Sequence, residues 1–234
     1  MIEDAADAID IVRNARARRT RLSFDPVTGR ARLTLPPRAS VRKALAWAGQ
    51  QRIWLAEQQA RLPQARPFVS GAVIPVDGVE LTIDWSAVHP RLPAVSGDRL
   101  VLGGPQDMVP RRVEAWLKRR ALAVLAVDTA HYAARAGVVV SGVAVGDARG
   151  RWGSCAHHGA IRYSWRLVLA PPDVRRATAA HEVAHRVHMN HSPAFHALVA
   201  TLYGREPATE RAWLRAHGAA LHWFGRSSDG SRGG

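Results

Sequence analysis

Two histidines and a glutamate occur in the segment His181-Glu182-Val183-Ala184-His185, a spacing that suits metal-dependent hydrolysis. On a helix, residues four apart lie on one face, so both imidazoles can reach a single tetrahedral ion. Glu182 lies one residue further round the helix, where its carboxylate can take a proton from zinc-bound water and pass it to a leaving group. The segment therefore predicts zinc on His181 and His185, with Glu182 as the catalytic base.

A catalytic zinc needs a third protein ligand. His191 follows an asparagine, a residue that commonly ends a helix, so the chain can bend there and return to the ion. His188 shares the helical face with His181 but lies about 10 Å from it along the axis, too far for one ion. We therefore favour His191. The alternatives for this position are His188, Glu206 and Glu210.

The composition predicts a folded protein without a membrane span. The chain has 234 residues, of which 47% are hydrophobic, enough for a core in one or two domains. Its apolar runs are broken before the roughly 18 residues that span a bilayer, and an acidic segment follows Met1. We therefore expect a cytoplasmic protein. The single cysteine, Cys155, excludes a cysteine-based zinc cluster, so histidines and carboxylates must bind any metal.

The net charge of +14 is compatible with an acidic partner such as nucleic acid. Lysine occurs only at Lys43 and Lys118, so the other 31 of the 33 basic residues are arginine. This skew is typical of a GC-rich coding bias, and we interpret most of the charge as an incidentally basic surface. A nucleotide or nucleic-acid partner stays open, and the oligomeric state is not predicted.

The N-terminal half is predicted to form a small α/β module over residues 20–104, after a segment without a strong pattern at 1–19. Alternating apolar residues around the turn at 25–29 predict a β-hairpin. Ser40 can cap a helix whose apolar residues recur at the helical period up to Pro63. Strands at 73–76, 79–83 and 100–102 complete the predicted module.

The C-terminal half, 105–224, is predicted to form the catalytic domain, followed by a disordered tail at 225–234. A helical pattern runs from Arg111 to about Arg135 and ends at Gly137. The remaining predicted elements are a β-branched run at 138–145, strands at 151–155 and 161–169 around a turn at 157–159, a helix after Pro171 that holds the histidines, a helix from Ser192-Pro193 to Gly204, and a last helix from about 208 to 222.

Five motifs follow one another in the second half of the chain. They are Arg151-Trp152-Gly153-Ser154-Cys155, Ser164-Trp165-Arg166-Leu167, Ala170-Pro171-Pro172, His181-Glu182-Val183-Ala184-His185 and Asn190-His191-Ser192-Pro193-Ala194-Phe195. In this order they resemble the YgjP-like zinc metallopeptidases, a family related to the SprT-like proteases. The resemblance implies an α+β fold with a zincin-like catalytic domain beside the N-terminal module. It also implies zinc on His181, His185 and His191, with Glu182 as the catalytic base.

Four residues near these motifs are candidates for binding substrate: Arg151, Trp152, Tyr163 and Arg166. The arginines can stabilise an oxyanion or bind a carboxylate or phosphate, and Tyr163 can donate a hydrogen bond to a tetrahedral intermediate. Trp152 belongs to a segment that can offer an edge strand to an extended peptide. Each also has a structural interpretation, as a packed aromatic residue or as part of a basic surface.

Three functions are compatible with these residues. The first is a metallopeptidase that acts on a peptide or protein. The second is a metal-dependent nucleoside triphosphate pyrophosphohydrolase, which has been suggested within the resembling family. The third is a nucleic-acid-associated protease, which the SprT relationship implies. A structural zinc is closed by four protein ligands, whereas this chain offers three convincing ones, so we expect a catalytic zinc and a peptide substrate.

Overall fold

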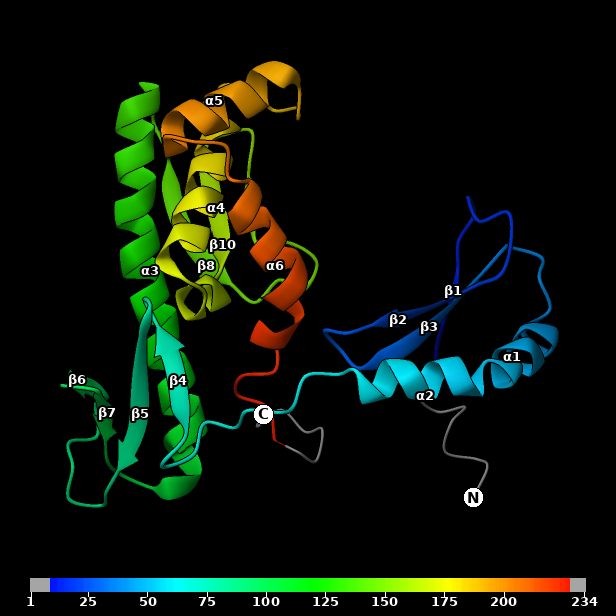
Figure 1. Cartoon of the computed structure of the whole chain (residues 1–234), viewed down its shortest axis with the longest axis horizontal. Coiled ribbons are helices and arrows are strands. Elements are labelled where there is room, and N and C mark those ends of the chain that lie inside the picture. The colour runs from blue at the N-terminus through cyan, green and yellow to red at the C-terminus, as the bar shows by residue number, and fades with distance from the viewer. Residues whose placement is uncertain (1–8, 228–234) are drawn as a thin grey trace. The chain divides into compact units, whose positions relative to one another are not determined.

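The computed structural model describes residues 9–227, and the chain divides into two compact units, Met1–Gln64 and Ala65–Gly234 (Figure 1). This division falls well before the boundary expected at 104/105. Most of the tail expected at 225–234 lies outside the described residues, as does the start of the segment 1–19.

The first unit contains a three-stranded sheet of β1 (Ile9–Arg13), β2 (Arg21–Asp25) and β3 (Arg30–Leu35), in the order β1-β3-β2. Strands β2 and β3 form the predicted hairpin, and Gly29 in its turn has the positive φ that favours glycine. Strand β1 pairs with β3 in parallel, so the segment expected to lack a pattern contributes a strand. Its five residues are too few for periodicity to reveal them.

Two helices follow where the sequence predicts one. Helix α1 (Val41–Gln50) begins at Ser40, whose hydroxyl accepts a hydrogen bond from the Lys43 amide at 3.3 Å. Its buried residues Ala44 and Ala48 pack against Leu33 and Leu35 of β3. Helix α2 (Arg52–Ala60) starts after a single residue outside helical geometry. Apolar periodicity does not register such a short interruption, so the prediction of one continuous helix was wrong.

The second unit begins with a sheet of β4 (Val73–Val76), β5 (Val79–Trp85), β6 (Ala94–Ser96) and β7 (Arg99–Leu102), ordered β4-β5-β7-β6. After η1 (Gln106–Met108), α3 (Val109–Ala136) runs to Gly137, close to the predicted bounds. Buried residues of the sheet, such as Ile83 and Leu100, share one core with Val113 and Leu117 of α3. The boundary expected at 104/105 therefore lies inside a single hydrophobic core.

The elements nearest the histidines form a second sheet and three helices. Strands β8 (Gly142–Gly146), β9 (Gly153–Cys155) and β10 (Ala160–Ser164) are ordered β8-β10-β9, which leaves β9 at an edge. The strand expected to continue to Leu169 ends at Ser164, and Trp165–Leu169 forms a fully buried 3-10 helix, η2. An apolar run in the sequence predicts that the segment is buried, but it does not distinguish a strand from a helical turn.

Helices α4 (Pro172–Ala184), α5 (Pro193–Tyr203) and α6 (Ala208–Leu221) complete the unit. Ser192 caps α5 by accepting a hydrogen bond from the Phe195 amide at 3.3 Å, and α5 ends at Gly204 with a positive φ. The helices and small mixed sheets confirm the predicted α+β class. Within the part of the chain that the structure describes, no helix is both long and apolar enough to cross a membrane.

Candidate metal centre

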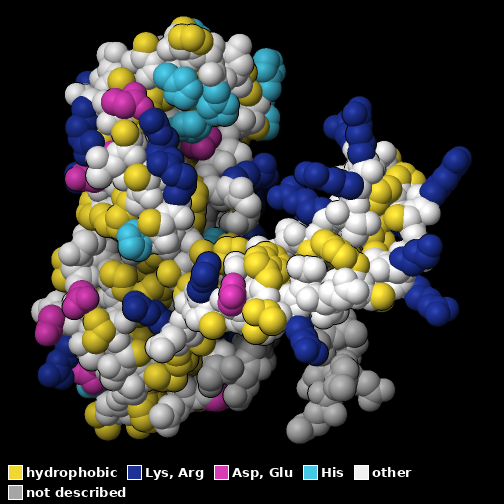
Figure 2. Space-filling model, turned by 45° about the vertical axis from the view of Figure 1, so that its right-hand side comes forward, with side chains coloured by type: hydrophobic (Ala, Val, Ile, Leu, Met, Phe, Trp, Pro, Cys, Tyr) yellow, Lys and Arg dark blue, Asp and Glu magenta, His cyan; other side chains and the backbone are white. Residues whose placement is uncertain are grey.

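The three predicted histidine ligands lie at the end of α4 and in the turn that follows it. His181 is in the last turn of α4, His185 is its C-terminal cap, and His191 directly precedes the cap of α5. Figure 2 shows histidine side chains gathered at the end of the second unit that carries α5. The helix ends at His185, five residues before the asparagine that was expected to end it, and the turn that follows brings His191 back to the other two histidines.

One potential ligand atom from each of His181, His185 and His191 lies within 4.8 Å of the other two. The Nε2 atoms of His181 and His191 are 3.3 Å apart. Two donors bound about 2.1 Å from a tetrahedral ion would be separated by about 3.4 Å. The spacing of these nitrogens therefore fits a single small cation.

His188 contributes its backbone rather than its imidazole. Nδ1–H of His185 donates a hydrogen bond to the His188 carbonyl oxygen at 3.0 Å, because a carbonyl can only accept. This fixes the tautomer of His185 and leaves its Nε2 lone pair available for a metal. The structure thus brings His191, and not the side chain of His188, to the other two histidines.

The two glutamates considered as remote ligands have other partners. Glu210 is bonded to Arg205 and accepts a hydrogen bond from the hydroxyl of Tyr203 at 3.0 Å. Glu206 forms an ion pair with Arg211. Neither belongs to the cluster of three histidines.

Phe195 supports all three rings, a role that sequence reasoning did not assign although the residue lies in a quoted motif. Its side chain is fully buried and stacks on His185, with ring centroids 4.5 Å apart. Its edge-on contacts with His181 and His191 have centroid distances of 4.9 and 4.8 Å. Because the Ser192 cap fixes the first turn of α5, it also fixes the aromatic platform beneath the histidines.

The imidazoles of His181 and His185 are held in the neutral form that binds metals. The pKa of His181 is lowered to about 4, mainly by burial and also by the neighbouring His185 and His191. Burial also lowers the pKa of His185, partly opposed by its hydrogen bond to His188. At neutral pH each of these two imidazoles therefore has one ring nitrogen with a free lone pair.

Glu182 is buried beside the histidines, with 5% of its surface exposed. Burial raises the pKa of its carboxyl group to about 7, against the opposing effect of the Arg151 cation. The side chain packs on the backbone of β9, where a Cβ added to Gly153 would lie 2.6 Å from Glu182 Cδ. Gly153 is therefore required for this close approach, a role that sequence reasoning missed because it depends on two elements meeting.

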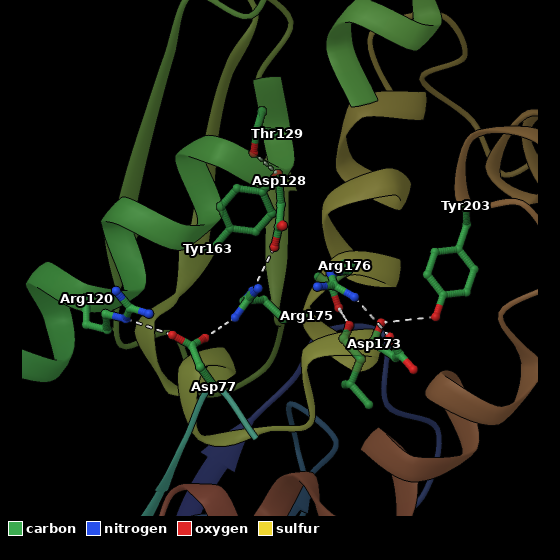
Figure 3. Close-up of polar contacts among 11 residues, drawn as sticks. Asp77, Arg120, Asp128, Thr129, Tyr163, Asp173, Arg175, Arg176 and Tyr203 are labelled. Atoms are coloured by element: carbon green, nitrogen blue, oxygen red, sulfur yellow. Dashed lines mark hydrogen bonds and ion pairs between the residues drawn. The ribbon is translucent and has the colours of Figure 1, made fainter. Parts of the chain in front are cut away.

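A network of ion pairs around the buried Arg175 fixes the other end of α4 (Figure 3). Arg175 donates to Asp128 of α3 at 2.7 Å and to Asp77, in the turn between β4 and β5. Asp77 also accepts a hydrogen bond from Arg120 at 2.7 Å. These contacts tie the helix that carries the histidines to α3 and to the first sheet of the second unit.

Two of the four predicted substrate-binding residues border the site. Arg151 and Trp152 line a cavity together with His181 and Glu182. The ring of Trp152 also packs on α6, since a Cβ added to Gly218 would lie 2.8 Å from its Cζ2, and its centroid is 5.4 Å from that of His222. Trp152 therefore combines the packing and the site-lining interpretations.

The other two candidates have structural roles, so their prediction as substrate-binding groups is corrected. Tyr163 is 1% exposed, and its hydroxyl is hydrogen-bonded to Thr129 of α3 at 2.9 Å (Figure 3). Arg166 is 4% exposed, pairs with Asp147 at 2.7 Å and donates to the carbonyl oxygens of Leu221 and Phe224. Sequence motifs mark both residues but do not show which way the side chains point.

Three convergent histidine nitrogens with a buried carboxylate beside them are the arrangement that a metal-dependent hydrolase requires. The chain belongs to the YgjP-like family: the family model described as YgjP-like, metallopeptidase domain, matches residues 18–217. Neither the comparison with curated proteins nor that with solved structures gave a match. Membership of a metallopeptidase family implies a metal and a peptide or protein substrate, and the histidine cluster is the group of residues suited to hold the metal.

Proposed function

We propose that this protein is a zinc-dependent peptidase in which His181, His185 and His191 hold the metal and Glu182 is the general base. The observation that carries the proposal is the state of Glu182. It is buried beside the three nitrogens, yet among residues 9–227 no side chain forms a hydrogen bond or ion pair with its carboxylate. Burying a carboxylate without a bonding partner costs free energy. This cost favours a catalytic role, in which the carboxylate exchanges a proton with the reacting groups.

The donor set fits zinc. Three imidazoles and no thiolate suit a borderline divalent ion, and three protein ligands leave one position for a reactant. When bound, zinc supplies Lewis acidity that polarises a carbonyl group and makes water easier to deprotonate. The single cysteine does not compete, since burial raises the pKa of the Cys155 thiol and keeps it protonated.

Glu182 would hold and move the proton. Its carboxylate accepts a proton from the attacking water and delivers it to the amine that leaves. Gly153 keeps the strand backbone close enough to fix the carboxylate, and Phe195 holds the imidazoles in place. The chain's own contribution is thus a positioned base and a rigid set of ligands.

The open edge of β9 suits an extended peptide. The Ser164 amide donates to the Trp152 carbonyl at 2.8 Å, and the Ala156 amide donates to the Ala160 carbonyl at 2.8 Å. Residues 152, 154 and 156 therefore direct their peptide groups to β10, and those of Gly153 and Cys155 point to the free edge. A substrate strand can pair with these groups beside Glu182.

Metal analysis and hydrolysis assays test the proposal. The purified protein should hold about one zinc per chain and cleave a degenerate peptide library. Glu182→Gln should keep the zinc while hydrolysis falls by at least about 100-fold, because only the base is removed. His191→Ala should weaken zinc binding, and Glu80→Gln, at an exposed position on β5, should change neither property.

Parallel assays with nucleoside triphosphates and with DNA-bound protein substrates address the two alternative activities. Hydrolysis of a nucleoside triphosphate but of no peptide would replace the proposed substrate class. Full activity of Glu182→Gln on every substrate would exclude the proposed base.

A further inference from the structure

A cavity of about 270 Å³ opens directly beside Glu182 and His181, and both residues line it. One wall of the cavity is formed by the face of α4 that carries Val174, Ala177, Thr178 and His181. The other is formed by α6, which runs alongside α4 (Figure 1), and by the segment entering β9. The apolar part of the lining includes Val174 and Ala177 of α4 and Leu214 of α6, and Arg151 lines the cavity from the segment before β9.

Apart from His181 and Glu182 at the metal centre, the polar groups of the two helical walls are already used within the protein. The hydroxyl of Thr178 donates to the carbonyl oxygen of Val174 at 2.9 Å. The carboxylate of Glu210 is taken up by Arg205 and Tyr203, and Arg211 is paired with Glu206. A polar side chain placed between the two helices, away from Arg151, would lose its water without gaining partners.

The size of the cavity suits one side chain rather than a whole small molecule. Pockets for drug-sized ligands start at about 300 Å³, slightly above this volume. A nucleoside triphosphate would also need several free cations. Among the lining residues, all of which the structure describes, Arg151 is the one cation without an ion pair.

We propose that this cavity is the subsite for a medium or large apolar side chain of the substrate, at the residue adjoining the scissile bond. The inference rests on the proposed peptidase function, because it takes Glu182 and His181 to mark where that bond is broken. Burial of a leucine-sized group against Val174, Ala177 and Leu214 should increase affinity by about ten- to a hundredfold.

Binding of hydroxamates to the zinc-loaded protein tests the subsite without catalysis. Leucine hydroxamate and isobutylsuccinyl hydroxamate carry the same apolar group on the first and on the second carbon from the hydroxamate carbonyl, so they present it at two distances from the metal. Calorimetry should show that at least one of them binds about tenfold or more tightly than its unsubstituted counterpart, glycine hydroxamate or succinyl hydroxamate.

Two variants change the cavity in opposite directions. Ala177→Leu fills it and should remove the preference for the isobutyl group while zinc content and binding of the unsubstituted probe stay the same. Leu214→Ala widens it and should shift the preference from leucine to phenylalanine hydroxamate. Ala212→Leu is the matched control, since Ala212 is exposed on α6 and does not line the cavity.

Equal binding of substituted and unsubstituted probes, no binding of either, or the same response to Ala177→Leu and Ala212→Leu would overturn the subsite. Sequencing the products of the peptide library separates this failure from that of the proposed function. Cleavage without an apolar preference would refute the subsite alone. A preference for apolar hydroxamates with no peptide cleaved would refute the peptidase function alone.

Discussion

A charged side chain is buried near each end of α4, but only one of the two side chains has bonding partners. Arg175 near the start of the helix is held between Asp77 and Asp128. Glu182 near its end is buried to a similar degree, and no described side chain is bonded to its carboxylate. The first arrangement is that of a structural charge, and the second is the one that the proposed general base requires.

The same contrast holds for the other buried charges of the second unit. Arg166 is paired with Asp147, and Glu210 is paired with Arg205. Of the buried arginines and glutamates among residues 9–227, Glu182 is thus the one without a partner. Burial alone does not point to a catalytic residue, whereas burial without a bonding partner supports the catalytic role proposed for Glu182.

The largest effect is expected at the structural end of the helix. Arg175→Met should destabilise the protein by about 3–5 kcal/mol, because it leaves two partly buried carboxylates without their shared cation. Urea denaturation measures this loss. Arg176→Met is the matched control on the same helix, since its pair with Asp173 is exposed (Figure 3) and should contribute less than about 1 kcal/mol.

Glu182→Gln should leave the urea midpoint unchanged or raise it, because no ion pair is lost. A loss of stability as large as that of Arg175→Met would remove the contrast between the two ends.

An intermediate effect is expected at Gly153. Gly153→Ala places a methyl group against Glu182 and should displace the carboxylate, reducing peptide hydrolysis by about 100-fold while zinc remains bound. Steady-state kinetics and metal analysis check both parts. Gly142→Ala in β8 of the same sheet, where the added methyl meets no neighbouring atom within 4 Å, should retain activity. Equal activity of the two variants would contradict the positioning role.

The smallest effect is expected at the aromatic platform. Phe195→Leu should weaken zinc binding by about tenfold, because the three imidazoles lose the ring that orients them. A competition assay with a chelating dye measures the affinity. Phe68→Leu removes an equally buried ring that packs near Gly225 and should lower stability alone. If both variants bind zinc with the same affinity as the parent protein, Phe195 is only a core residue.

Local sequence rules predicted much of the fold and those site residues that lie close to one another in the sequence. The hairpin around Gly29, the long helix before Gly137 and the Ser192 cap of α5 each depend on residues close in sequence. The convergence of His181, His185 and His191 was predictable for the same reason, since one helix and one turn separate them. Strand β1 and the interruption between α1 and α2 escaped prediction because neither changes the apolar pattern enough.

The sequence by itself determined the chemistry of this protein: which side chains can bind a metal, which can carry a proton, and that they lie on one helix and its following turn. The tertiary structure decided which of the neighbouring residues take part. Tyr163 and Arg166 turn into the core, whereas Arg151 and Trp152 border the cavity and Gly153 admits Glu182. The physical reason is that ligand spacing is a property of one helix, while burial, pairing and access depend on elements that meet from distant parts of the chain.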